Sequence, residues 1–267
     1  MNLFELFVKI GADTTEANKG IDEVGQKTSG LGEKLKSGLA TVGKAAVAGV
    51  TACVAALGTL GTKAVSAYAD YEQLVGGVQT LFSETQLSFS EFAASANMTN
   101  DEARDTYLEM TKGWRMVVRN AEQAYKNVGL STNEYMETVT SFAASLVASL
   151  GGDTEAAAQK ADLAITDMSD NANKMGSSME SIQNAYQGFA KQNYTMLDNL
   201  KLGYGGTQKE MERLLADAEK ISGIKYDISS YADIVDAIHV VQTEMGITGT
   251  TAEEAASTIQ GSFGMMK

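Results

Sequence analysis

The chain has 267 residues, no proline, one histidine, one cysteine and a formal net charge of -13. One cysteine excludes an internal disulfide and a thiolate metal site, and one histidine excludes multi-histidine zinc sites. The acidic balance argues against wrapping nucleic acid, and an alanine-rich chain without proline favours a mostly α-helical fold.

Residues 1–12 are predicted to contain a short N-terminal β-strand. Phe4, Leu6, Val8 and Ile10 recur at a period of two, which is typical of a half-buried strand. The segment lacks the basic and apolar regions of a signal peptide. Because a lone strand leaves its backbone groups unpaired, we expect it to pair with a second copy or with another protein.

Residues 13–70 are predicted to form a long Gly/Ala-rich helical segment, with Asp13 and Glu16 as its N-terminal cap. Small and apolar residues recur in steps of four and three, which indicates a coiled coil built for close helix association. These residues are Leu35, Leu39, Val42, Ala46, Gly49, Cys53, Ala56 and Leu60. Cys53 therefore fits a small packed residue better than a reactive thiol.

The run Ala45–Thr62 carries no charge and is flanked by Lys44 and Lys63. Its 18 residues are at the lower edge for a membrane span, and few of them are strongly apolar. Packing against copies of itself is favoured, and a membrane-competent helix stays open. The candidate association or membrane residues are Leu35, Leu39, Val42, Ala46, Gly49, Val50, Cys53, Val54, Leu57 and Leu60.

Residues 71–267 hold the excess of acidic residues and are predicted to form a multi-helix globular domain. Four pairs fit capping boxes: Thr99 with Glu102, Ser131 with Glu134, Thr207 with Glu210, and Thr251 with Glu254. Apolar faces follow at helical spacing. They comprise Tyr135, Val139, Phe142, Leu146 and Leu150; Ala161, Ile165, Met168, Ala172 and Met175; Met179, Ile182, Tyr186 and Phe189; Met211, Leu214, Leu215, Ala218 and Ile221; and Ile234, Ile238, Val241 and Met245.

Polar groups in this domain favour structural roles. His239 could pair with Asp236 on one helix face, although a surface or partly buried histidine is the favoured interpretation. Asp167, Asp170, Asn171 and Asn173 offer oxygen ligands without calcium-loop spacing, so we expect a solvated helix face. Leu202–Thr207 lacks the spacing of a phosphate loop and is expected to be an interhelical loop ending in the Thr207 cap. Thirteen methionines fit either core packing or a surface for partner helices.

Three long segments resemble the tail tape measure proteins of long-tailed bacteriophages and prophages. They are NANKMGSSMESIQNAYQGFAKQNYTMLDNLKLGYGGT at 171–207, MERLLADA at 211–218 and GITGTTAEEAASTIQGS at 246–262. The opening strand and the Gly/Ala-rich helix are similar as well. The resemblance implies a non-enzymatic ruler without cofactors that lies in the tail lumen and helps to set tail length.

The resemblance also implies partners and places. These are other copies of the chain, tail tube, tail assembly and tail tip proteins, the host cytoplasm during assembly, and the host membrane during genome ejection. A fully helical chain of this length would span only about 400 Å, so we expect the N-terminal part of a longer protein or a truncated reading frame. The rival classes are a membrane-active helical effector, a minor structural tail protein and a wall-degrading enzyme. The last lacks a recognisable pair of catalytic acids.

Overall fold

The computed structural model describes residues 69–251, which belong to a compact unit that begins at Ala69. Helices hold 73% of these residues and strands none, so the prediction of a mostly α fold is confirmed for this part. The predicted strand within 1–12 and most of the helical segment at 13–70 lie outside the described residues.

The helices follow one another with short connections. Residues 69–82 are helical, and the later elements are α4 (Phe89–Ser95), α5 (Asn100–Met110), α6 (Lys112–Asn127), α7 (Thr132–Ser149), α8 (Thr154–Met175), α9 (Met179–Phe189), the 3-10 helix η1 (Leu197–Leu200), α10 (Gln208–Ser222) and α11 (Tyr231–Glu244). A further helix begins at Thr250.

Side-chain caps fix most helix starts. The capping boxes predicted at Thr99 and Ser131 are confirmed, and Ser88 with Glu91 forms another. Thr207 accepts a hydrogen bond from the Glu210 amide as predicted, but the Glu210 carboxylate turns to the amide of Gly205. Each cap satisfies amides that a helix end leaves unpaired. Because this role favours Ser, Thr, Asp and Asn, the helix starts could be predicted from the sequence.

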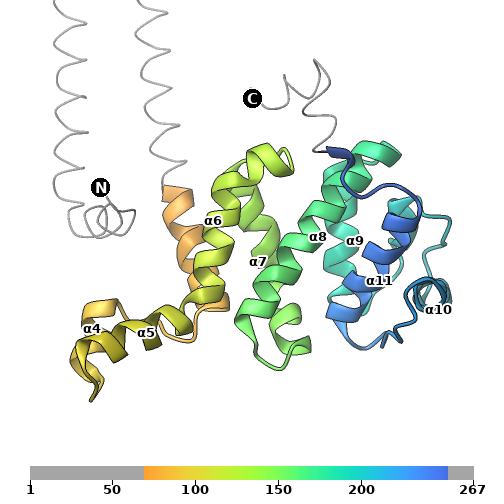
Figure 1. The fold of residues 1–267 in the computed structure, drawn as a ribbon. Coiled ribbons are helices and arrows are strands. Elements are labelled where there is room, and N and C mark those ends of the chain that lie inside the picture. The colour runs from red at the N-terminus through yellow and green to blue at the C-terminus, as the bar shows by residue number, and fades with distance from the viewer. Residues whose placement is uncertain (1–68, 252–267) are drawn as a thin grey trace, which may run out of the picture. The chain divides into compact units, whose positions relative to one another are not determined.

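Helix α8 is the centre of the unit (Figure 1). It packs against α6 and α7 on one side and against α9 and α11 on the other, while α10 packs on α11. Alanines are fully buried on both α6 and α8, so small side chains line a close helix contact. Gly113 serves the same contact, because a Cβ there would lie 2.5 Å from the backbone oxygen of Thr154.

The predicted apolar faces form the core, with two exceptions. Tyr135, Tyr186 and Phe189 are buried, as are most of the other predicted positions. Ile221 and Met245 were expected to be buried and are 46% and 45% exposed, so the prediction is wrong for them. Both lie at helix ends, just before Gly223 and Gly246, where the chain turns with a positive φ.

Candidate functional site

A group of buried polar side chains lies along α8 where it meets α11. Asp167 is fully buried, and its carboxylate oxygens lie 2.9 and 3.1 Å from Nδ1 of His239, whose side chain is 31% exposed. Asp236, the alternative partner considered for His239, instead forms an ion pair with Lys160. The proposed His239–Asp236 pair is therefore wrong, whereas a partly buried histidine is confirmed.

The His239–Asp167 pair holds a proton tightly. Burial raises the pKa of the Asp167 carboxyl, and the hydrogen bond to His239 opposes this effect. The same hydrogen bond raises the pKa of His239, against the smaller opposing effect of its burial. Asp170 and Asp236 add negative charge nearby, and Lys160 adds positive charge. The pair therefore keeps its shared proton to a higher pH than a free imidazole would.

Asp170 caps a helix that belongs to a distant part of the chain. Its buried carboxylate accepts hydrogen bonds from the amides of Gly249, at 2.6 Å, and Thr251, at 2.8 Å. These are amides at the start of the helix that begins at Thr250, where a negative charge is stabilising. Thr251, predicted as a cap itself, thus receives its cap from α8, and its predicted partner Glu254 lies outside the described residues.

Asn171 joins α8 to η1 and α11. Its Nδ2 donates to the backbone oxygen of Leu200 at 3.0 Å and to Oε1 of Gln242 at 2.9 Å. Asn171 and Gln242 are both buried. The expectation of a solvated face at Asp167, Asp170 and Asn171 is therefore wrong, because α8 is covered on this side by α11 and the segment that follows it.

Residues 171–207, the longest segment of the tape measure resemblance, fold back on themselves. Ser177 donates to the backbone oxygen of Asn199, and the Asn199 amide donates to the backbone oxygen of Ser181. Nζ of Lys201 binds the backbone oxygens of Met175 and Gly176 at the end of α8. The polar residues of this segment therefore hold η1 against the ends of α8 and α9.

The Leu202–Thr207 loop leads into α10, as predicted, and closes tightly. A Cβ on Gly206 would lie 2.2 Å from the backbone oxygen of Thr195, so only glycine fits this approach. A Cβ on Gly205, in contrast, would make an ordinary contact, 3.6 Å from a side-chain carbon of Glu210. The loop is therefore shaped by packing against the turn before η1.

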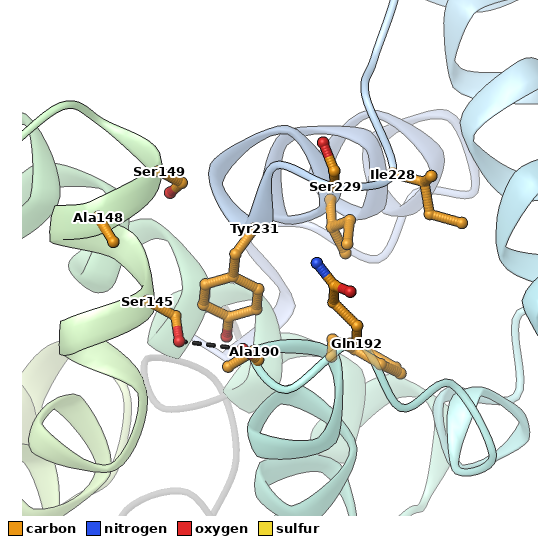
Figure 2. A pocket seen from close by; sticks show the side chains of 10 residues that line it. Ser145, Ala148, Ser149, Ala190, Gln192, Ile228, Ser229 and Tyr231 are labelled. Atoms are coloured by element: carbon orange, nitrogen blue, oxygen red, sulfur yellow. Dashed lines mark hydrogen bonds between the residues drawn. The ribbon is translucent and has the colours of Figure 1, made fainter.

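A pocket of about 290 Å³ opens beside α11 (Figure 2). Its lining comes from the end of α7, the turn after α9 and the start of α11. The lining residues carry no formal charge, and they include three serines and Gln192. Sequence reasoning missed this pocket because its residues come from three separate segments, none of which contains a recognisable motif.

The other predicted features divide between the two parts of the chain. The ten candidate association or membrane residues, from Leu35 to Leu60, lie outside the described residues. Within 69–251, no helix is both long and apolar enough to cross a membrane, and no group of three His, Cys, Asp or Glu side chains could hold a metal ion. Met168 and Met211 are buried, whereas Met98, Met196 and Met245 are exposed, so methionine occurs both in the core and on the surface.

Comparison of the whole chain with protein-family models, curated proteins and solved structures finds no match.

Proposed function

We propose that this chain is part of a phage tail tape measure protein. In this proposal the Gly/Ala-rich segment at 13–70 belongs to the helical ruler, and the helices of 69–251 form a folded module that contacts tail tube, tail assembly or tail tip proteins. The resemblance of residues 171–207 to that family carries the proposal. The protein would act as a scaffold in the tail lumen, would be made in the host cytoplasm, and would leave the tail with the genome.

Two structural features support a scaffold role for the module. Residues 171–207 are bound to one another through Ser177, Asn199 and Lys201, so the segment that carries the resemblance is held together by hydrogen bonds of its own. The polar groups of α8 are also engaged in packing, since Asp170 caps a later helix and Asn171 links η1 to α11. Side chains committed in this way serve to hold helices together.

The ruler is tested by changing its length in a phage or prophage that encodes this chain. Duplicating residues 13–70 adds 58 residues, which at 1.5 Å per helical residue lengthens the tail by about 90 Å. Deleting the same residues shortens it by the same amount. Tail lengths are measured by electron microscopy of negatively stained particles.

The matched control keeps the number of residues and changes side chains predicted to mediate helix association. Replacing Leu35 and Leu39 by alanine leaves the number of residues unchanged, so tails that form must have the parental length. Tails that keep the parental length after both the duplication and the deletion would contradict the ruler. Mass spectrometry of the purified particles establishes in each case that the altered chain is incorporated.

A membrane-active effector is the second candidate, and the uncharged run Ala45–Thr62 between two lysines favours it. The full chain would then release a fluorescent dye from vesicles of anionic and neutral lipids. Replacing Val50 and Val54 by aspartate would abolish release, because charge at the centre of a span opposes insertion. A minor structural tail protein would instead be found in particles without affecting either tail length or vesicles.

A further inference from the structure

The pocket beside α11 presents hydrogen-bond acceptors. Ser145 donates its hydroxyl proton to the backbone oxygen of Ala190 at 3.0 Å. Ser149 donates to the backbone oxygen of Leu146 at 2.9 Å and accepts from the backbone amide of Ala232 at 3.2 Å. Ser229 donates to the carboxylate of Asp227 at 2.8 Å. The hydrogen bonds from Ser229 hold the pKa of Asp227 below its usual value, so this acceptor stays ionised. All three hydroxyls have used their protons; those of Ser145 and Ser229 accept no hydrogen bond within the described residues, and that of Ser149 keeps one lone pair beside the bond from Ala232.

Gln192 sits at the rim in a backbone conformation that favours glycine. Its φ is 57°, in the turn that ends α9, where its backbone N–H donates a hydrogen bond to the backbone oxygen of Phe189. Glycine is the usual residue at such a position, because a side chain there is strained. The side-chain amide of Gln192 nevertheless points into the space between the lining segments (Figure 2). Strained residues cluster at ligand sites, which makes Gln192 a candidate ligand contact.

We propose that this pocket binds a small, neutral molecule with several hydroxyl groups, of the size of one sugar ring. The acceptors of the three serines match hydroxyl donors, and the Gln192 amide can both donate and accept. A volume of 290 Å³ is near the lower end for ligand pockets, roughly 300–1,000 Å³, which limits the ligand to about one ring. Apolar walls from Ala148, Ile228 and Ile234 suit the C–H faces of such a ring.

A cation is disfavoured although it too is rich in donors. The lining residues include no carboxylate, and an ammonium or guanidinium group in a partly enclosed neutral pocket would lose hydration without an ionic partner. The Asp227 carboxylate is engaged by the amide and hydroxyl of Ser229 and lies outside the lining. The ligand is therefore neutral, and its binding is independent of the proposed tail function.

The test uses the full chain and saturation-transfer NMR. The probes are methyl α-glucoside, N-acetylglucosamine and glycerol, with methylguanidinium as the cationic probe, each raised to about 50 mM, well above the millimolar affinities of weak ligands. We expect saturation transfer from the protein to at least one sugar and none to methylguanidinium. Transfer to glycerol should be weaker than transfer to the sugar. Saturation of no sugar, or of methylguanidinium in preference to the sugars, would overturn the proposal.

Variants locate the binding. Gln192→Gly relieves the strained backbone, so its melting temperature should equal or exceed that of the parent while its sugar affinity falls about tenfold or more. Lys201→Gly is the matched control, since Lys201 also has a positive φ of 54° and does not line the pocket; it should keep full binding. Ala148→Phe, at an exposed lining position, should fill the pocket and abolish binding. Undiminished sugar binding in both Gln192→Gly and Ala148→Phe would place the ligand elsewhere.

Discussion

Asp167 is an acidic residue whose side chain is fully buried. A carboxylate without exposed surface loses its hydration and needs a partner that replaces it. His239, 72 residues further along the chain, supplies that partner from α11 and stays exposed enough to exchange protons with solvent. The contact between α8 and α11 therefore depends on a histidine whose pKa is raised by its hydrogen bond to Asp167.

The first prediction concerns Asp167→Asn and pH. Because the folded protein raises the pKa of His239 above its unfolded value near 6.5, the pair stabilises fully below that pH and loses its contribution as the pH rises through the folded value. The raised pKa of Asp167 likewise makes the stability of the folded protein fall as the pH rises. We expect the substitution to cost about 1–3 kcal/mol near pH 5.5 and about 1 kcal/mol less near pH 8.5, measured by urea unfolding.

Asp162→Asn is the control for this measurement. Asp162 lies on the same helix and accepts a hydrogen bond from the hydroxyl of Tyr135 at 2.6 Å, and burial raises the pKa of that tyrosine still further above neutral pH. Its substitution should therefore have the same cost at both pH values. An Asp167→Asn cost that does not change with pH would show that the pair carries no charge-dependent energy.

At the scale of single elements, α8 and α4 differ in how far they are buried. α8 contacts helices on both sides and buries ten of its residues, whereas α4 buries none. α4 and the neighbouring α5 are held to each other by an aromatic cluster, in which Tyr107 lies 5.5 Å from the ring of Phe89 and 5.7 Å from that of Phe92. In Figure 1 these two helices lie beside the start of α6. Few buried contacts connect them to the rest, which favours local opening.

The second prediction is that α4 and α5 open without global unfolding. Amides of residues 89–110 should exchange with deuterium faster than those of α8, by mass spectrometry of peptides. Tyr107→Ala should speed their exchange further and change the free energy of global unfolding by less than about 0.5 kcal/mol. This result is expected because the ring of Tyr107 joins the two helices to each other.

Tyr107→Phe separates the ring from the hydroxyl. It keeps both aromatic contacts and loses only the hydrogen bond to the backbone oxygen of Leu87, so exchange should stay close to that of the parent. If Tyr107→Ala instead lowered global stability by about 3–5 kcal/mol, as truncation of a core aromatic does, α4 and α5 would belong to the cooperative core.

For the whole molecule, local patterns were predictable and distant contacts were not. Helical spacing identified Tyr186 and Phe189 as core residues, and the cap at Ser131 was read from four consecutive residues. Asp170 was misassigned because a buried and an exposed carboxylate look alike in sequence, and its partners lie about 80 residues away. The pocket at Gln192 was missed for the same reason, since only the tertiary fold brings its three segments together.

The third prediction follows from the net charge of the chain. The chain carries 34 acidic and 21 basic residues, and the mutual repulsion of this excess negative charge opposes folding. Raising NaCl from about 0.01 M to about 0.15 M shortens the screening length from about 30 to about 8 Å. We expect the melting temperature at pH 7.5 to rise by about 2–4 °C, or about 1 kcal/mol.

Near pH 4.6, where the net charge vanishes, the same salt should have little effect. A melting temperature that falls with salt at pH 7.5 would mean that exposed ion pairs, such as Lys112 with Glu155, outweigh the repulsion.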